Sequence, residues 1–331
     1  IIGTALGPYS PGSAYVLLHH YMGEVDGTVG AWGYARGGMG SITKAMASSF
    51  KSKNGEIKAG SPVTKILIKN NKSYGLVLEN GDEIYADKIV SNLDVKRTFL
   101  KVVEEKELPN DFYKAVKNFK IRGSSGKLNI ALDDLPIWKS IPEGDPAGTG
   151  DLHITQNIEE MEGAYDDWKD GKWSQFPYVD MCIPSINDPT MAPQGKHYMS
   201  VFIQYVPYNL ADGGWTEEKR LEFGKHVMSR IGNYSTNFND IINHAEIRTP
   251  KELEAEVGLT EGNIFQGELT MDQLMFNRPV PGYAQYKTPI KNLYMCGSST
   301  HPGGGVMGAP GANAAREILK DLNKKISTHY I

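Results

Sequence analysis

The chain is poor in cysteine, carries no strong excess of either charge and lacks long apolar runs. Its two cysteines, Cys182 and Cys296, are far apart and outside any C-x-x-C pair, so neither a disulfide framework nor a dithiol redox centre is indicated. The formal net charge is -4, and nothing in this balance favours nucleic acid as a partner. The apolar runs fall far short of the roughly 20 residues of a transmembrane segment. The composition predicts a soluble chain in a reducing compartment, and we expect the cytoplasm.

The composition is otherwise that of a folded protein with a sizeable core. Hydrophobic residues make up 40% of the 331 residues, and this length suggests two domains or one domain with a large insertion. The sequence begins Ile1-Ile2-Gly3, with no initiator methionine and no recognisable signal segment. We therefore expect that this start is a cut.

The first third of the chain predicts short helices and strands. A short apolar helix should place Leu17, Leu18 and Tyr21 on one face. A second helix should follow Gly37-Gly38-Met39-Gly40, with Ser41 as its N-cap. Strands are expected over residues 57–59, 63–68, 74–78, 83–85 and 88–91, with Asn80-Gly81 as a tight hairpin turn.

The middle of the chain, residues 121–285, carries no cofactor fingerprint and is predicted to contain its own sheet. A strand is expected over residues 198–206, and a helix should stop at Gly232. Thr249-Pro250-Lys251-Glu252 predicts a capping box, and Gly258 is the expected end of that helix. The many aromatic residues of this section suit an apolar lining, although each one alone is more often a core residue.

The last segment carries the most informative pattern: a strand at 293–296, a glycine-rich loop at 297–311 and a one-faced helix. Eight of the fifteen loop positions are glycine or proline, so the backbone can approach a flat or anionic ligand closely. The N-terminus of the helix offers N–H groups and a partial positive charge, which suits a pyrophosphate or the pyrimidine end of a reduced flavin. A loop shaped only for tight packing is the structural alternative.

The same loop matches the spacing G-x-G-x-x-G at Gly303, Gly305 and Gly308. This spacing indicates a dinucleotide-binding unit only where a second strand and a ribose-binding carboxylate follow. The chain ends at Ile331, which leaves no room for these parts, so we reject that interpretation.

Three groups of residues carry a family resemblance. The first comprises Arg278-Pro279, the strand ending at Cys296-Gly297, and His301 to Val306 with Gly308. The second comprises Gly37-Gly38-Met39-Gly40, Val63, Gly81 and Val90-Ser91-Asn92, and the third Asp26-Gly27 with Gly30 to Tyr34. Together they resemble the phytoene desaturase and carotenoid isomerase family of FAD-dependent oxidoreductases, and the third group resembles its pyridine nucleotide-disulphide oxidoreductase domain-containing branch. The similarity runs through nearly the whole chain.

The resemblance implies a mixed α/β fold like that of the amine oxidases. An FAD domain assembled from separated segments would occupy residues 36–100 and 286–331, and a substrate domain built on a mixed sheet and helices would occupy residues 1–35 and 101–285. The family's opening strand, glycine turn and helix, which hold the FAD pyrophosphate, are absent from this sequence. We therefore expect a missing N-terminal FAD-binding segment as a partner, and weak FAD binding or none without it.

FAD is the implied cofactor, and the resemblance also implies its contacts. Val63 would meet the adenine side, and Gly297 and Ser298 would face the pyrophosphate and the ribityl chain. Residues 304–306 would lie along the isoalloxazine, with residues 306–308 near its pyrimidine carbonyl. Many related flavoproteins carry an acidic residue at the position of Ser298. The serine would therefore make a weaker contact with the ribityl chain. The predicted cofactor-binding residues are Val63, Gly297, Ser298, Pro302, Gly303, Gly304, Gly305, Val306, Met307 and Gly308.

For the intact protein the resemblance implies hydride transfer between flavin and a hydrophobic small molecule, such as a polyene or an isoprenoid-like compound. No catalytic side chain and no metal site are assigned, because the cofactor carries the chemistry. His301 is a candidate proton donor or shapes the loop before Pro302. A reduced-flavin isomerase and a non-catalytic binding or assembly module stay open as alternatives. A homo-oligomer is also left open, as is the mitochondrial matrix if the source is eukaryotic.

Overall fold

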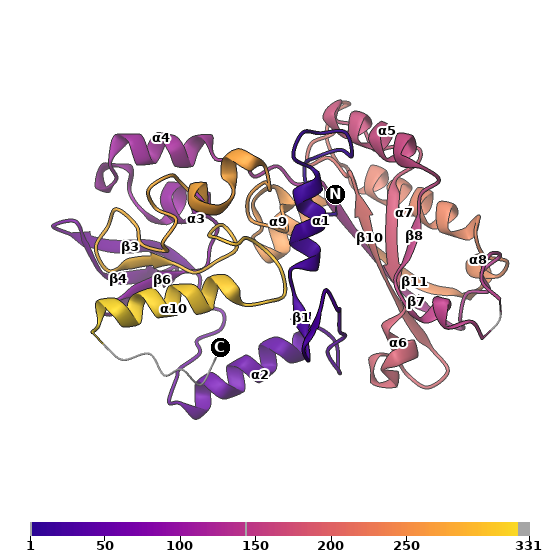
Figure 1. Cartoon of the computed structure of the whole chain (residues 1–331), viewed down its shortest axis with the longest axis horizontal. Coiled ribbons are helices and arrows are strands. Elements are labelled where there is room, and N and C mark those ends of the chain that lie inside the picture. Colours follow the sequence, from indigo (N-terminus) through magenta and orange to yellow (C-terminus); the bar gives the residue numbers. More distant parts are fainter. Residues whose placement is uncertain (1, 143, 324–331) are drawn as a thin grey trace. The chain divides into compact units, whose positions relative to one another are not determined.

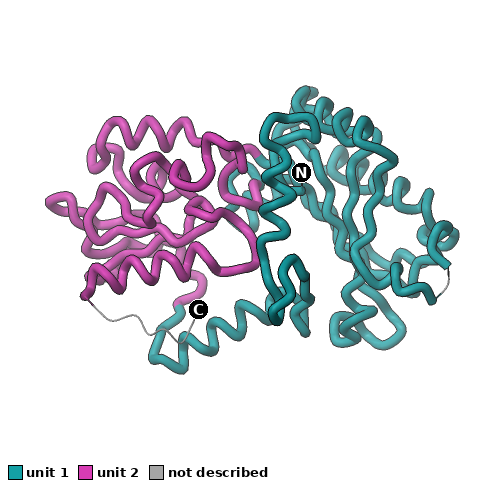
Figure 2. Tube along the Cα trace, in the orientation of Figure 1, with its two compact units in different colours: residues 1–57, 123–262 teal, residues 58–122, 263–331 magenta. Residues whose placement is uncertain are grey.

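The chain forms two compact units, and each consists of two separate segments (Figure 2). The computed structural model describes all residues except 1, 143 and 324–331, so both ends of the chain lie outside the described residues. Unit 1 comprises Ile1–Ile57 and Gly123–Gly262, and unit 2 comprises Lys58–Arg122 and Asn263–Ile331. The boundaries between the two units differ from the predicted domain boundaries. The assignment of segments to an FAD domain and a substrate domain stays a prediction.

Unit 1 is built on a five-stranded sheet with the order β11-β7-β10-β9-β8 (Figure 1). Its strands are β7 (Ser125–Leu132), β8 (Leu152–Ile154), β9 (Tyr178–Cys182), β10 (His197–Gln204) and β11 (Ile242–Arg248). Neighbouring strands pair antiparallel throughout this sheet. The sheet therefore differs from the mixed sheet that the resemblance implied, because strand direction depends on long-range pairing and not on the local pattern.

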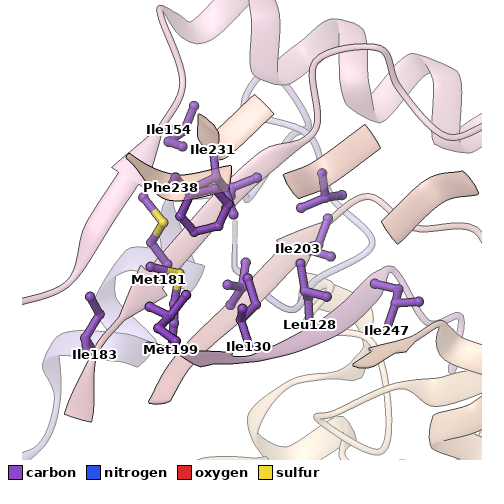
Figure 3. Packing of buried hydrophobic residues seen from close by; sticks show 14 of the residues in the cluster. Leu128, Ile130, Ile154, Met181, Ile183, Met199, Ile203, Ile231, Phe238 and Ile247 are labelled. Atoms are coloured by element: carbon purple, nitrogen blue, oxygen red, sulfur yellow. The ribbon is translucent and has the colours of Figure 1, made fainter. Parts of the chain in front are cut away.

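One face of this sheet forms the main hydrophobic core. Alternate residues of β7 and β10 point to this face and are fully buried, as period-two alternation requires: Leu128, Ile130, Leu132, Met199, Val201 and Ile203. Figure 3 shows several of them gathered with Ile231 and Phe238, which lie on α7 (Glu217–Gly232) and α8 (Phe238–Ile241). Each such side chain contributes about 1.5–3 kcal/mol by burial. The predicted strand and the helix end at Gly232 are confirmed.

The remaining helices of unit 1 follow local signals to different degrees. Thr249 and Glu252 form the predicted capping box at the start of α9 (Pro250–Val257), and Gly258 ends it in a left-handed conformation. The prediction that Ser41 is the N-cap of α2 (Gly40–Ser52) is wrong, because its hydroxyl donates to the Gly38 carbonyl from inside the helix. Unit 1 also contains α1 (Ala14–Tyr21), the hairpin β1 (Glu24–Val25) and β2 (Thr28–Val29), α5 (Ile158–Lys169) and α6 (Pro184–Asn187).

Helix α1 exposes the apolar face that the sequence pattern singled out. Leu17, Leu18 and Tyr21 are all more than half exposed, whereas Val16 and His19 are the buried residues. The periodicity therefore located the helix correctly and did not identify the side that packs against the rest of unit 1.

Unit 2 contains two small sheets and three α-helices among its described residues. The antiparallel strands β3 (Val63–Lys69), β4 (Lys72–Leu78) and β5 (Glu83–Tyr85) form one sheet, and β6 (Ile89–Ser91) pairs in parallel with β12 (Leu293–Met295) in the other. Its helices are α3 (Val95–Arg97), α4 (Asn110–Asn118) and α10 (Ala309–Asp321). The hairpin turn at Gly81 is confirmed by its φ of 90°, but residues 57–59 form no strand.

The parallel pairing of β6 with β12 explains how two distant segments build one unit. Both strands are central to a second hydrophobic core, in which Ile89, Leu293 and Met295 pack with Phe99 and Phe112. No helix in the described part of the chain is long and apolar enough to cross a membrane.

Candidate functional site

The loop between β12 and α10 in unit 2 begins where the chain passes tightly against the segment that follows β6. Cys296 N donates to the Ser91 carbonyl at 2.9 Å, which extends the parallel pairing by one residue. A Cβ atom on Gly297 would lie 2.5 Å from the Asn92 carbonyl oxygen. Only glycine allows this approach, so Gly297 fixes the direction in which the loop leaves the sheet.

The next residues of the loop are held by buried hydroxyl groups. Ser299 Oγ donates to the Gln266 carbonyl at 2.6 Å and accepts from Val95 N at 3.0 Å. Thr300 Oγ1 donates to the Gly297 carbonyl at 2.7 Å. Both side chains are inaccessible to solvent, so these bonds hold the first half of the loop in a single arrangement.

Arg278 anchors the same segment from the other side. It is completely buried, and its guanidinium donates to the carbonyl of Ser298 through Nε at 3.1 Å and Nη2 at 2.8 Å. Further bonds reach the carbonyls of Phe265 at 2.8 Å and Glu268 at 3.2 Å. The sequence pattern drew attention to Arg278-Pro279 as a motif, but it did not predict that this cation holds the loop.

The second half of the loop is open on one side and closed on the other. A Cβ on Gly304 would lie 2.8 Å from the Phe265 ring, so the ring closes one side of the loop. Gly305 has a φ of 148°, which side chains rarely tolerate. The next two side chains face outward, with Val306 74% and Met307 48% exposed. The loop thus presents backbone and two apolar side chains on its accessible side.

Helix α10 begins directly after this loop. Gly308 precedes it in a left-handed conformation, and no side chain caps its N-terminus. The first N–H groups of a helix have no partner within the helix, and they carry a partial positive charge. The helix is 13 residues long, so the loop ends at a N-terminus that can bind an anionic or carbonyl oxygen.

His301 lies at the bend of the loop. Its carbonyl accepts from Tyr286 Oη at 2.7 Å, and Asn313 Nδ2 donates to that hydroxyl at 2.8 Å. Its ring atom Nδ1 is buried and has no hydrogen-bond partner among the described residues. Burial lowers the pKa of His301, and the charge of Arg278 lowers it further. The ring is therefore a poor proton donor at neutral pH and a better acceptor for a ligand group.

Nine of the ten predicted cofactor-binding residues lie together in this loop, at Gly297, Ser298 and residues 302–308. Val63 belongs to the same unit and to another sheet, at the start of β3, where it pairs with Leu78. The structure thus shows the geometry of the predicted residues, and their contact with a cofactor stays a prediction.

Comparison with known proteins decides the family. Residues 3–319 match the protein family described as "flavin containing amine oxidoreductase". The chain belongs to this family. FAD is the cofactor of these flavoproteins, and the mixed α/β fold is that of the amine oxidase-like oxidoreductases.

Individual relatives agree with this family assignment. This chain is 40% identical to the mouse (Mus musculus) pyridine nucleotide-disulfide oxidoreductase domain-containing protein 2, over 97% of this chain and 57% of the mouse protein. It is 24% identical to the lycopene-forming phytoene desaturase of a Paracoccus species, over 95% and 60% of the two chains. The chain therefore spans less than two thirds of the length of these relatives.

The fold also resembles that of solved oxidoreductases. The crystal structure of an oxidoreductase from Methanosarcina mazei matches with a TM-score of 0.60 at 18% identity, over 96% of this chain and 62% of that one. At this identity the likeness shows the fold alone.

The residues of the loop fit the cofactor of the family. The close packing at Gly297 and Gly304 fixes the loop from the inside, while Gly305 to Gly308 are exposed and the uncapped N-terminus of α10 suits a flavin oxygen. The unpaired Nδ1 of His301 is an acceptor for an N–H or O–H group. By contrast, burial raises the pKa of Cys296, which favours the thiol over the thiolate.

Proposed function

We propose that the protein is an FAD-dependent oxidoreductase that transfers a hydride between a hydrophobic small molecule and flavin. One observation supports the proposal most strongly: a strand, a glycine loop that is exposed in its second half, and an uncapped helix follow one another at residues 293–321 in a chain that belongs to a flavin oxidoreductase family. Bound FAD supplies the hydride chemistry, which no side chain provides.

The residues of this chain would bind and orient the cofactor. Gly297 and Ser298 would face its pyrophosphate and ribityl chain, with Val63 on its adenine side. Residues 304–306 would lie along the isoalloxazine, and the N-terminus of α10 behind Met307 and Gly308 would face its pyrimidine edge. Positive potential at that helix end favours an anionic ring over a neutral one, so this end of the site would promote electron acceptance.

The test measures flavin binding by the purified chain and by a charge variant of the loop. Val306→Asp places a carboxylate on a side chain that is 74% exposed, so folding should not change. The new charge opposes an anionic ligand at the helix N-terminus, and we expect FAD affinity to fall about tenfold or more, which corresponds to about 1.4 kcal/mol. Titration of flavin fluorescence up to about 1 mM FAD detects weak binding as well.

Val29→Asp is the matched control. Val29 is the same residue type at 76% exposure, but it lies in unit 1, on β2. Its substitution should leave FAD affinity unchanged. Equal affinity of the wild type and the Val306→Asp variant would contradict the proposed site. If the wild type does not bind over the whole titration, the same pair of variants is compared in the protein that carries the expected FAD-binding segment, where equal flavin content would contradict the site. In the active protein, a product isomerised without net redox change would favour the reduced-flavin isomerase instead.

A further inference from the structure

The sheet of unit 1 carries polar side chains on the face opposite its hydrophobic core. The register aligns Lys127 on β7 with Phe202 on β10 and, beyond it, Asp180 on β9. The next row on the same face consists of Asn129, Ser200 and Cys182, and β11 adds Arg248 beside Lys127 and Glu246 beside Asn129. Arg248 and Glu246 form an ion pair with each other at 3.0 Å. An antiparallel sheet often has one solvated polar face, yet the six side chains on β7, β10 and β9 are only partly exposed.

Lys127 is the charged side chain of this face with the weakest pairing to an opposite charge. Its Nζ donates to the Ser200 hydroxyl, and in the described part of the chain no carboxylate lies within 4 Å of it. Asp180 stands two strands away, at a backbone spacing of about 10 Å. Burial lowers the pKa of Lys127, and the nearby acidic groups of Cys182 and Asp180 oppose this shift.

A mostly buried ammonium group with only a hydroxyl partner is unfavourable unless an anion or another polar group joins it. Asp180 does not supply that anion. Burial raises the pKa of its carboxyl group, the charge of His153 at 3.4 Å lowers it, and Asp151 raises it again. The ammonium has three donor directions and Ser200 takes one of them, so two remain for a ligand.

Asn129 adds a second donor next to Lys127. The Tyr198 hydroxyl donates to Asn129 Oδ1 at 2.8 Å, which turns the Nδ2 group of the amide to the other side. Asn129 and Lys127 are two residues apart on β7, so their side chains rise from the same face about 7 Å apart. Phe202 and Tyr198 flank these donors with aromatic surface on β10.

We propose that Lys127, Asn129 and Ser200 bind the carboxylate of an amphiphilic ligand whose apolar part lies against Phe202 and Tyr198. This inference rests on the proposed function only in taking that ligand as the substrate. It narrows the substrate class from hydrocarbons such as polyenes to apolar molecules with a carboxylate end.

The experiment measures binding of three probes of equal chain length, decanoate, decanol and decylamine, to the flavin-free chain by calorimetric titration. Decanoate should bind at least about tenfold more tightly than decanol, and Lys127→Met should remove that difference. Lys127→Arg should restore it to within a few fold, because the guanidinium keeps the charge. Lys196→Met is the control, since Lys196 is an exposed lysine paired with Asp133, and decanoate binding should not change.

Asn129→Leu provides a second variant in case Lys127→Met fails to fold, and it should also weaken decanoate binding severalfold. Equal binding of decanoate and decanol, unchanged binding by folded Lys127→Met or Asn129→Leu, or preference for decylamine would each overturn the proposal, the last by pointing to Asp180. FAD titration of the same preparation tests a different loop in unit 2. Failure of the carboxylate proposal would therefore leave the flavin proposal standing, and the reverse also holds.

Discussion

Arg278 donates two hydrogen bonds from its guanidinium to the carbonyl oxygen of Ser298, from Nε at 3.1 Å and from Nη2 at 2.8 Å. This contact ties the residue before Pro279 to the second residue of the glycine loop, although 20 positions separate them in the chain. Because Arg278 is completely buried, this part of the loop takes its shape from the interior of unit 2.

Arg278→Met should destabilise unit 2 strongly. The variant removes a buried cation and leaves several buried carbonyls without donors, and each such group costs about 1–3 kcal/mol. We expect the free energy of unfolding to fall by about 3 kcal/mol or more, measured by urea titration with far-ultraviolet circular dichroism. All five tryptophans lie in unit 1, so tryptophan fluorescence should shift less than circular dichroism. Arg316→Met, on α10 and bonded to Asn313, should cost about 1 kcal/mol or less. Equal effects of the two substitutions would argue against the anchoring role of Arg278.

Gly297→Ala should also destabilise the protein, because the added methyl group meets the Asn92 carbonyl oxygen at 2.5 Å. Overpacking of this kind costs about 1–3 kcal/mol, to be measured by thermal unfolding. Gly311→Ala is the matched control, since nothing lies within 4 Å of its Cβ position and it sits in α10, where alanine is favoured over glycine by about 1 kcal/mol. The two variants should therefore shift the melting temperature in opposite directions, and a shared direction would contradict the close approach at Gly297.

His301 should make the protein less stable below neutral pH. Its pKa is lowered by burial and by Arg278, so the unfolded chain binds a proton at a higher pH than the folded chain does. The stability from the neutral ring is present above the unfolded pKa of about 6.5 and is lost as the pH falls below it. The difference in unfolding free energy between pH 7.5 and pH 5.5 should shrink in His301→Gln. It should not vanish, because burial also lowers the pKa of His20. A pH dependence unchanged by His301→Gln would contradict this account.

Local signals in the sequence gave several elements correctly. The capping box at Thr249 and the hairpin turn at Gly81 depend on residues within four positions, and both appear as predicted. The strand, glycine loop and helix at the end of the chain were also predicted, because each part has a strong pattern of its own. Ser41 failed as an N-cap because the helix starts two positions earlier than predicted, at Gly40 with Met39 as its N-cap.

The amino-acid sequence by itself therefore determined the family, the flavin cofactor and the position of the glycine loop, since these depend on short motifs. Only the tertiary structure decided that Arg278 and Ser299 fix this loop, that Phe265 closes one side of it, and that the sheet of unit 1 is antiparallel. It also placed Lys127 beside Ser200 from another strand. Contacts of this kind join residues tens of positions apart, and periodicity carries no information about which distant segments meet.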